Sequence, residues 1–356
     1  MISLARPLIS DEEKNEVKKV LDSGILAQGE KVKNFEEDFA NYCGVKYGIA
    51  VNSGTAALHL ALIANKISKG DEVITTPFSF IATVNTIKMA GAKPVFVDIN
   101  EDTFNIDETK IEEVITDKTK AIMPVHLYGN PCNMKEIMNL ANNYDLKVIE
   151  DACQAHGAMY NDSKVGSFGT GTFSFYPTKN MTTGEGGIIT TNDPDINEMC
   201  RKLRQHGMAQ RYSYECLGYN YRMTDIGAAI GVIQLKKLDF WNEKRIENAN
   251  LLSSLLKDVN GIITPKVDSS TKHVFHQYTI RVTNSFGKTR DEVINLLNDA
   301  GIGNAIFYPR PLYYYSHVGF NGKLEVTEKV CNEVISLPIH PNLSEDDLHR
   351  IAEVFI

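Results

Sequence analysis

Short apolar runs alternate with segments of helical pattern through the first half of the chain, and this alternation limits the folds open to it. The runs predict strands at 47–51, 71–76, 93–99, 120–126, 146–151, 171–175 and 186–191. Helical segments such as TAALHLALIA (55–64) and FIATVNTIKMAG (80–91) lie between them. Apolar strands separated by helices predict a mostly parallel sheet with helices on both faces.

The second half of the chain has a different pattern. A long helical segment begins near Thr224 and continues to about Val259, and we expect it to connect two lobes. After it, the sequence predicts a strand at 277–282, a helix at 289–301 and a last helix at 344–355 with Ser344 as its N-cap.

These elements predict two domains of unequal size. A chain of 356 residues has ample material for two hydrophobic cores. We predict an α/β protein in which residues 1–240 form a large domain around the mostly parallel sheet. Residues 241–356 are then expected to form a smaller α+β domain.

Composition and charge argue against two classes of partner. The net charge of −8 argues against a broad surface for nucleic acids. No run approaches ~18 consecutive apolar residues, and the N-terminal segment lacks the basic start and apolar stretch of a signal peptide. We therefore expect no membrane span and a cytoplasmic protein.

Metal and dinucleotide motifs are missing from the sequence as well. The nine histidines show no metal-binding spacing, so we expect no metal. No Walker A sequence is present, and the glycine-rich GSFGTG (166–171) precedes a predicted strand rather than a helix, so it is no dinucleotide fingerprint. The cysteines are scattered without a CxxC pair, which predicts reduced thiols at Cys43, Cys132, Cys153, Cys200, Cys216 and Cys331.

Two local patterns follow predicted strands, where parallel α/β sheets bind ligands. In NSGTAAL (52–58), small residues at a helix start leave backbone N–H groups open to a phosphate, although Ser-Gly-Thr also begins ordinary helices. In VIEDACQAHGA (148–158), Glu150 and Asp151 close an apolar strand. Asp151 either pairs with a cationic ring nitrogen or caps the next turn, and His156 is more typical of a core histidine than of a catalyst.

Two further patterns carry cations. FYPTKNMTTGEGG (175–187) places Lys179 among small residues and turn formers. Most lysines are surface charges, but one held near apolar or cationic neighbours can lose its proton and attack a carbonyl. LGYNYRMTDIGAA offers Asn220 and Arg222 as donors to an anion, or it is a simple lead-in to the long helix.

Taken together and in this order, these patterns resemble the DegT/DnrJ/EryC1/StrS family of sugar aminotransferases, which are pyridoxal-phosphate (PLP) enzymes of fold type I. The similarity covers nearly the whole chain, from ARPLISDEE near the N-terminus to SLPIHPNL near the C-terminus. Between them it includes NSGTAALHLAL, PFSFIATVNTI, GAKPVFVDI, PVHLYGNPCNM, IEDACQAHGA, SFYPTKNMTTGEGG and LGYNYRMTDIGAAIG. So many collinear motifs do not arise by chance.

The resemblance implies roles for the strand-end residues. It implies that Lys179 forms an imine, the internal aldimine, with PLP and that Asp151 pairs with the pyridinium nitrogen. It also implies that Gly54 and Thr55, helped by the Ser174 hydroxyl, hold the phosphate. The pairing with Asp151 suits the chemistry, because PLP withdraws electrons only while its ring nitrogen is protonated or strongly hydrogen-bonded.

The resemblance further implies that Phe80 stacks on the cofactor ring and that Gln154 lies beside the ring hydroxyl. Active sites in this family are shared across a homodimer, and the GYNYR segment reaches into the neighbour's site. Asn220 is the first candidate for that contact and Arg222 the second. We also expect the small residues around Lys179 to leave room for the cofactor ring and a sugar.

The resemblance implies a reaction in two halves. An amino donor, expected to be L-glutamate, leaves its amino group on the cofactor as pyridoxamine 5'-phosphate, and a keto-sugar nucleotide then takes it up. MTTGEGG is similar to members that aminate C4 of a 4-keto-6-deoxy sugar nucleotide, such as those that make perosamine, whereas EDACQAHGA is closer to members that aminate C3. We expect C4 amination for amino-sugar and surface polysaccharide synthesis, with C3 amination as the alternative.

The C-terminal FYPRPLYYYSH departs from the family's usual HYPxPLH pattern, with Phe307 where a histidine is common. That segment lies near the sugar nucleotide in relatives, so the departure bears on the substrate. Tyr308, Arg310 and the run Tyr313–Tyr315 either contact a base or diphosphate, or pack in the core.

Three other functions agree with parts of the pattern. PLP dehydratases of the family have a histidine in place of the lysine, so Lys179 argues against that activity. A non-catalytic regulatory member is the second alternative, and the intact set of Asp151, Gln154, Ser174 and Lys179 argues against it. An amino-acid transaminase on this fold presents an arginine in the smaller domain to the substrate carboxylate, and the sequence alone identifies no such arginine.

Overall fold

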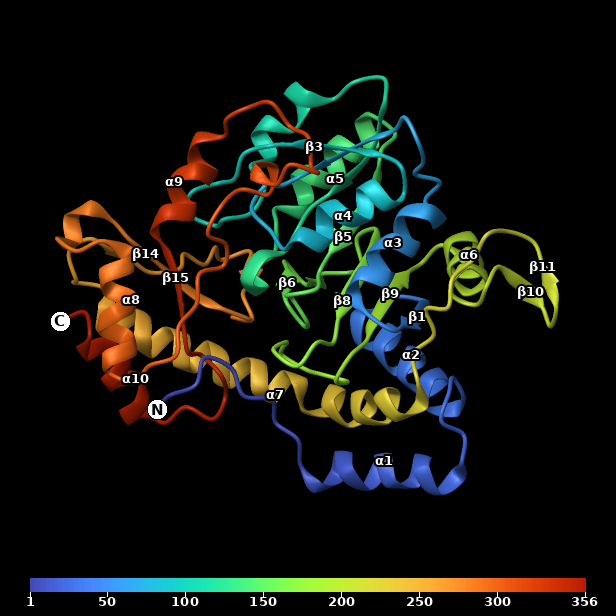
Figure 1. Cartoon of the computed structure of the whole chain (residues 1–356), viewed down its shortest axis with the longest axis horizontal. Coiled ribbons are helices and arrows are strands. Elements are labelled where there is room, and N and C mark those ends of the chain that lie inside the picture. Colours follow the sequence, from blue (N-terminus) through green and yellow to red (C-terminus); the bar gives the residue numbers. More distant parts are fainter.

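The computed structural model describes all residues, 1–356, and has a seven-stranded sheet at its centre (Figure 1). Its strands are β1 (Tyr47–Val51), β2 (Glu72–Thr75), β3 (Lys93–Phe96), β4 (Thr119–Met123), β5 (Lys147–Asp151), β8 (Thr170–Ser174) and β9 (Gly187–Thr191). They lie in the order β1-β9-β8-β5-β4-β2-β3. Only β9 is antiparallel to its neighbours, β1 and β8, while all other pairs are parallel. The mostly parallel sheet expected from the sequence is confirmed.

Helices cover both faces of this sheet. The helices of the chain are α1 (Asp11–Ser23), α2 (Glu30–Cys43), α3 (Gly54–Ala64), α4 (Ile81–Met89), α5 (Met134–Asn143), α6 (Pro194–Arg204), α7 (Asp225–Leu256), α8 (Arg290–Asp299), α9 (Glu325–Glu333) and α10 (Glu345–Glu353), and those of the large lobe cover the sheet. Ile49 and Val51 pack in one core with α3 and α6, whereas Ala50 packs in another with α2 and α7. Because successive strand residues point to opposite faces, an apolar strand such as β1 needs helices on both sides.

Helix α7 joins two hydrophobic cores. It begins where Thr224 Oγ1 accepts the N–H of Gly227 at 3.2 Å, which is the N-cap contact expected there. Leu238 packs with α2 in the large lobe, while Leu252 and Leu256 pack in the core of a smaller lobe. Figure 1 shows the helix running beneath both lobes. The long connecting helix predicted from the sequence is confirmed.

The small lobe contains the antiparallel sheet β12-β14-β15, with α8 and α10 packed against it. Its strands are β12 (Ile262–Ile263), β14 (Tyr278–Val282) and β15 (Val334–Leu337). Ile2 of the N-terminal segment also lies in this core and pairs with Ile302. In the other direction, β13 (Thr271–Lys272) pairs with β6 (Met159–Tyr160) of the large lobe, which also pairs with β7 (Ser163–Lys164). We propose that the domain boundary lies within α7, near residues 240–241.

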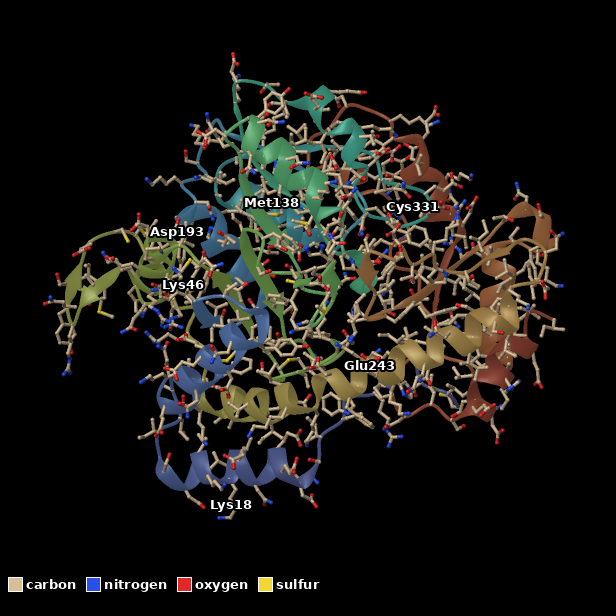
Figure 2. The ribbon with its side chains drawn as sticks, turned by 180° about the vertical axis from the view of Figure 1, so that it is seen from behind. Lys18, Lys46, Met138, Asp193, Glu243 and Cys331 are labelled. Atoms are coloured by element: carbon tan, nitrogen blue, oxygen red, sulfur yellow. The ribbon has the colours of Figure 1, made fainter.

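Two elements lie at the outside of the molecule. Helix α1 packs on α7, and seen from behind its Lys18 points away from the protein (Figure 2). The hairpin of β10 (Met208–Gln210) and β11 (Ser213–Tyr214) projects from the large lobe beyond α6 (Figure 1). None of the helices combines the length and the apolar character that crossing a membrane requires.

Candidate functional site

A cavity of about 780 Å³ lies where the carboxyl ends of the central strands face the small lobe. Segments that follow β1, β2, β5 and β8 form one wall of it. Residues 276–277 and 306–315 supply the rest. Parallel α/β sheets bind their ligands at this edge, so the cavity is the place to look for the residues singled out in the sequence.

Asp151 ends β5 and lines the cavity with only 5% of its surface exposed. Its Oδ2 accepts a hydrogen bond from Thr83 Oγ1 at 2.7 Å, and its Oδ1 accepts the N–H of Cys153 at 3.3 Å. The contact to Cys153 is the local cap that the sequence left open as one alternative. Because both donors are neutral, the buried carboxylate keeps its attraction for a cation.

Lys179 lies in the loop between β8 and β9 and lines the same cavity. Its backbone N–H donates to the carbonyl of Tyr176 at 2.9 Å, which fixes the turn that carries it. Burial lowers the pKa of Lys179, while Cys153 and Asp151 act in the opposite direction. A lysine with a lowered pKa loses its proton more readily and becomes a nucleophile.

The start of α3 lies very close to the end of β8. Ser53 caps the helix and accepts the N–H of Ala56 at 3.1 Å. A Cβ on Gly54 would lie 2.6 Å from Ser174 Cβ, so a larger residue would force the two segments apart. Thr55 is exposed at the cavity, and N–H groups of a first helical turn have no intrahelical partner. These features suit an anion such as a phosphate.

Phe80 and Gln154 also line the cavity, but they differ in how firmly they are held. Phe80 is 56% exposed, and its ring centroid lies 6.4 Å from that of Tyr308. Gln154 is buried, with Oε1 accepting the N–H of Tyr128 at 2.9 Å and Nε2 donating to Tyr308 Oη at 3.2 Å. The second N–H of the Gln154 amide remains free to donate to a ligand.

Asn220 and Arg222 take no part in lining this cavity. Asn220 is exposed and lies between Tyr219 and Tyr221, whose stacked ring centroids are 5.0 Å apart. Both tyrosine rings pack against His59 of α3. Because side chains alternate along an extended segment, Asn220 is on the side away from these rings. The expected contact of GYNYR with a neighbouring subunit stays a prediction.

Two of the glycines after Lys179, Gly186 and Gly187, lie in close packing rather than at the cavity. A Cβ on Gly187 would lie 2.3 Å from the carbonyl oxygen of Ser53, and one on Gly186 would lie 2.3 Å from Thr183 Oγ1. The residues of this stretch that line the cavity are Tyr176, Thr178, Lys179 and Glu185. At Gly186 and Gly187 the small residue thus makes room for other parts of the chain, and Gly187 lets β9 approach the start of α3.

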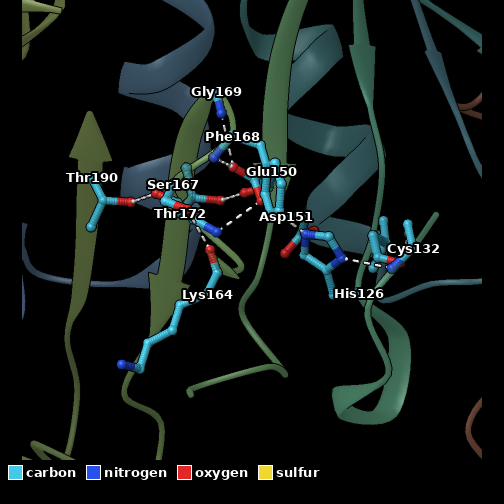
Figure 3. A network of polar contacts seen from close by, with 12 residues as sticks. His126, Cys132, Glu150, Asp151, Lys164, Ser167, Phe168, Gly169, Thr172 and Thr190 are labelled. Carbon is cyan, nitrogen blue, oxygen red and sulfur yellow. Dashed lines mark hydrogen bonds and ion pairs between the residues drawn. The ribbon is translucent and has the colours of Figure 1, made fainter. Parts of the chain in front are cut away.

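Glu150 precedes Asp151 on β5 but is fully buried on the opposite face of the sheet. Its carboxylate is the centre of a polar network (Figure 3). Oε1 accepts the N–H groups of Phe168 at 2.9 Å and Gly169 at 3.0 Å, and Oε2 accepts that of Gly166 at 2.8 Å. The glycine-rich GSFGTG segment therefore binds a carboxylate of its own chain.

His126 completes this network. Its Nδ1 accepts the N–H of Cys132 at 3.0 Å, so the proton of the neutral ring is on Nε2, which lies 3.2 Å from Glu150 Oε2. The backbone N–H of His126 donates to the carbonyl of Asp151 at 3.1 Å. The network thus fixes the end of β5, from which Asp151 reaches the cavity.

His156 lies in the core rather than in the cavity. It is fully buried, with its ring centroid 5.4 Å from that of Phe173 and 5.5 Å from that of Phe175. Burial lowers the pKa of His156 to about 3, so the ring is neutral at neutral pH. This placement agrees with the core histidine favoured by the sequence, although neither ring nitrogen has a hydrogen-bond partner.

Thr83 and His276 are among the residues of the cavity wall that the sequence did not point to. Thr83 lies three positions after Phe80 at the start of α4, and this spacing, which puts side chains on one face of a helix, was an available signal. His276 gave no local signal. It reaches the wall because its neighbour Gln277 donates its N–H to the carbonyl of Tyr128 at 3.2 Å, a contact between the two lobes.

The FYPRPLYYYSH segment divides between cavity and core. Its residues that line the cavity are Phe307, Tyr308, Arg310, Leu312 and Tyr315. Tyr313 is buried and donates to Glu328 Oε1 at 3.0 Å. Tyr314 is 56% exposed and lies outside the cavity. Tyr313 therefore packs in the core, whereas the contact of Tyr308 and Arg310 with a base or diphosphate stays a prediction.

Comparison with known proteins assigns the whole chain to one family. The model of the DegT/DnrJ/EryC1/StrS aminotransferase family matches residues 7–355. GDP-perosamine synthase from Caulobacter vibrioides is 43% identical over 357 residues, covering 98% of this chain and 96% of the relative. The dTDP-3-amino-3,4,6-trideoxy-alpha-D-glucose transaminase from Streptomyces venezuelae is 38% identical, covering 95% of this chain and 89% of the relative. NtdA from Bacillus subtilis, solved with bound cofactor PMP, has a TM-score of 0.89 at 33% identity, over 97% of this chain and 80% of NtdA.

These similarities agree with the architecture and with the cavity. The mostly parallel sheet between helices, joined to a smaller α+β lobe, is the fold of type I PLP-dependent transferases. PLP is the cofactor of the family, and PMP is its aminated form. The chain is accordingly a transaminase and belongs to the DegT/DnrJ/EryC1/StrS family of PLP-dependent aminotransferases.

Proposed function

We propose that this protein transfers an amino group from L-glutamate to C4 of a 4-keto-6-deoxy sugar nucleotide, and that the product serves surface polysaccharide synthesis. The observation that carries the proposal is the presence of Lys179, Asp151 and the first turn of α3 in the wall of one cavity. The similarity to GDP-perosamine synthase supports C4, because perosamine is a 4-amino sugar. The MTTGEGG stretch supports it too.

The side chains of the cavity fit PLP. Asp151 offers a buried carboxylate whose hydrogen-bond donors within the chain are neutral, and Lys179 offers an amine whose pKa is lowered by burial. We propose that Lys179 attaches the cofactor and that Asp151 pairs with its ring nitrogen. Gly54, Thr55 and Ser174 then hold the phosphate, since their close packing leaves N–H donors and no bulky side chain at the helix start.

Three further side chains complete the proposed site. Phe80, exposed at the cavity, stacks on the cofactor ring, and Gln154 donates its free N–H to the ring hydroxyl. Asn220 is exposed outside its own cavity, which supports a homodimer in which it reaches the site of the other subunit. Sugar aminotransferase relatives imply the two substrates, a nucleotide sugar and an amino donor.

The proposed roles of the chain's own residues follow from this arrangement. PLP, when bound, withdraws electrons from the substrate carbon that carries the amino group. Asp151 keeps the ring nitrogen protonated, because a carboxylate favours the charged form of a neighbouring base. Lys179 Nζ removes the proton from the substrate carbon and later returns one, a positioned base being worth about 10²–10⁴ in rate.

The proposal predicts a reaction in two separable halves. L-Glutamate alone is expected to abolish the visible absorption of the PLP-loaded protein and to release 2-oxoglutarate in an amount equal to the enzyme. A 4-keto-6-deoxy sugar nucleotide added next is expected to restore the absorption and gain an amino group, which mass spectrometry detects and NMR assigns to a carbon. If no amino acid changes the absorption, the transaminase proposal is wrong.

The position of the new amino group tests the finer part of the proposal. C3 amination is the alternative, supported by EDACQAHGA and by the similarity to a transaminase whose name carries a 3-amino sugar. Keto-sugar nucleotides with the ketone at C3 or C4 are offered in parallel with glutamate. Amination at C3 alone would contradict the C4 assignment and leave the transaminase function intact.

The packing of the helix start against β8 gives a second prediction. Gly54→Ala places a Cβ 2.6 Å from Ser174 Cβ and is expected to raise the Kd of PLP about 10–100-fold, because overpacking of about 1–3 kcal/mol displaces the N–H donors. Fluorescence titration of the apoprotein with PLP measures this. Gly227→Ala is the matched control, since its Cβ would meet its nearest atom at an ordinary 3.5 Å. Equal affinities in the two variants would contradict the proposed phosphate contact.

A further inference from the structure

We propose that Arg310 is a shared anion anchor, whose guanidinium binds a carboxylate of the amino donor and, in the other half of the reaction, the diphosphate of the nucleotide sugar. The inference rests on the proposed function, because only a reaction of two anionic substrates requires one cavity to hold both in turn. It names a binding residue for the substrates, separate from those proposed for the cofactor.

The charges along the cavity wall single out Arg310. The ionisable groups there include the acids Asp151 and Glu185 and the bases Lys179, His276 and Arg310. Burial lowers the pKa of His276 far below its ordinary value, so this ring carries no charge at neutral pH. Lys179 is assigned to the cofactor, and its pKa is lowered as well. Arginine keeps its proton in proteins, so Arg310 is the permanent cation that this chain offers to a substrate.

The guanidinium of Arg310 is free to bind. Five arginines are held in ion pairs, namely Arg201, Arg204, Arg281, Arg290 and Arg350. Arg6, Arg211, Arg222 and Arg245 are in no ion pair, but they do not line the cavity. Arg310 is exposed and has neither an ion pair nor a side-chain hydrogen bond within the chain. Its planar fork of N–H donors matches both a carboxylate and a phosphate, which are the anions of the two substrates.

The backbone that carries Arg310 is fixed on both sides. Tyr128 Oη donates to the carbonyl of Phe307, and the N–H of Leu312 donates to the carbonyl of Pro77 at 2.8 Å. Leu312 is also buried against α4. The base of the side chain is therefore set while its head group can rotate, as it must to reach anions at different distances from the reacting carbon.

Aromatic side chains share the cavity wall with this cation. Phe80, Tyr308 and Tyr315 line the cavity along with Arg310, and Phe80 and Tyr315 are both partly exposed. An arginine paired with an acid of the chain would have to break that pair to bind a substrate, whereas exposed Arg310, which is in no ion pair, can bind either anion in turn. Arg310 lies within residues 241–356, the part of the chain predicted to form the smaller domain.

Binding to the PLP-loaded protein tests the anchor without measuring turnover. Glutarate, a dicarboxylate that donates no amino group, and the nucleoside diphosphates GDP, UDP and dTDP are titrated by calorimetry. Arg310→Gln is expected to raise the Kd of glutarate and the Kd of the preferred nucleoside diphosphate by about 10–100-fold each. Arg310→Lys is expected to recover part of both affinities, because it restores the charge but not the two-point geometry.

Arg350→Gln is the matched control, with the same change of charge in the small lobe. Arg350 is exposed on α10, and its contact with Asp347 is 3.9 Å long, so both affinities are expected to stay at the wild-type value. The PLP absorption and circular dichroism of each variant report that the site and fold are retained.

Each outcome bears on the inference. Loss of both affinities in Arg310→Gln alone supports a shared anchor, whereas loss of only one means that Arg310 serves a single substrate and overturns the sharing. Wild-type affinities in Arg310→Gln, or a wild-type protein that binds neither ligand, overturn the anchor itself. In each of these cases glutamate still bleaches the wild-type PLP absorption if the proposed function is right, so the two failures are distinguishable.

Discussion

Lys179→Ala is expected to lower the rate of amino transfer by about 10⁴-fold or more, the largest effect that a single substitution in this chain should produce. The substitution removes the amine that we propose attaches the cofactor and moves the proton at the substrate carbon. Proton transfer by a positioned base alone contributes about 10²–10⁴ in rate. The variant should still fold, because Lys179 lines the cavity and its backbone contact to Tyr176 is retained.

Chemical labelling checks this prediction independently of activity. Borohydride reduction of the PLP-loaded wild-type protein, followed by digestion and mass spectrometry, is expected to find a phosphopyridoxyl group on Lys179. Lys179→Ala should carry none. Lys257→Ala is the matched control, because Lys257 is exposed beyond the end of α7, far along the chain from the cavity residues. A label on another lysine of the wild-type protein would contradict the assignment.

Glu150→Gln is expected to lower the free energy of unfolding by about 3–5 kcal/mol, although Glu150 touches no part of the cavity. The carboxylate accepts hydrogen bonds from the N–H groups of Gly166, Phe168 and Gly169 and faces Nε2 of His126. An amide replaces one of the two oxygens with an NH₂ group, which places donors against donors. Each buried donor left unpaired costs about 1–3 kcal/mol.

Urea unfolding measures this loss. The fluorescence of Trp241, the single tryptophan, reports on α7, where it lies mostly buried. Glu113→Gln is the control, since Glu113 is exposed, and its unfolding free energy is expected to stay within about 0.5 kcal/mol of wild type. An equally small effect of Glu150→Gln would show that the GSFGTG segment is held by other contacts.

The helices and strands were predicted well because their signals are local. The strands expected at 47–51, 146–151 and 186–191 correspond to β1, β5 and β9, and Thr224 and Ser344 are N-caps as predicted. Apolar residues recur every two positions in a strand and every 3.6 in a helix, so a short stretch of sequence displays the pattern. A helix cap likewise depends only on the few residues around it.

The glycine-rich stretches show the limit of local signals. Their composition suggests open space or a bound phosphate, yet Gly187 lies against the backbone of Ser53 and the GSFGTG segment binds Glu150. A glycine marks a place where something comes close. The approaching group is either a ligand or another part of the chain. Which of the two it is depends on the distant segments that pack there, and the residues next to the glycine do not reveal this.

By itself the sequence determined the order of the elements and the mostly parallel character of the sheet, and it pointed to Lys179 and Asp151 as the residues proposed for amino transfer. Only the tertiary structure decided which side chains meet at the cavity: it brought in His276 and the free guanidinium of Arg310, and it left Asn220 outside. The physical reason is that the chemistry of a side chain follows from its residue type, and helices and strands follow from the spacing of neighbouring residues, so the sequence displays both. The composition of a cavity wall, by contrast, arises from contacts between segments far apart in the chain.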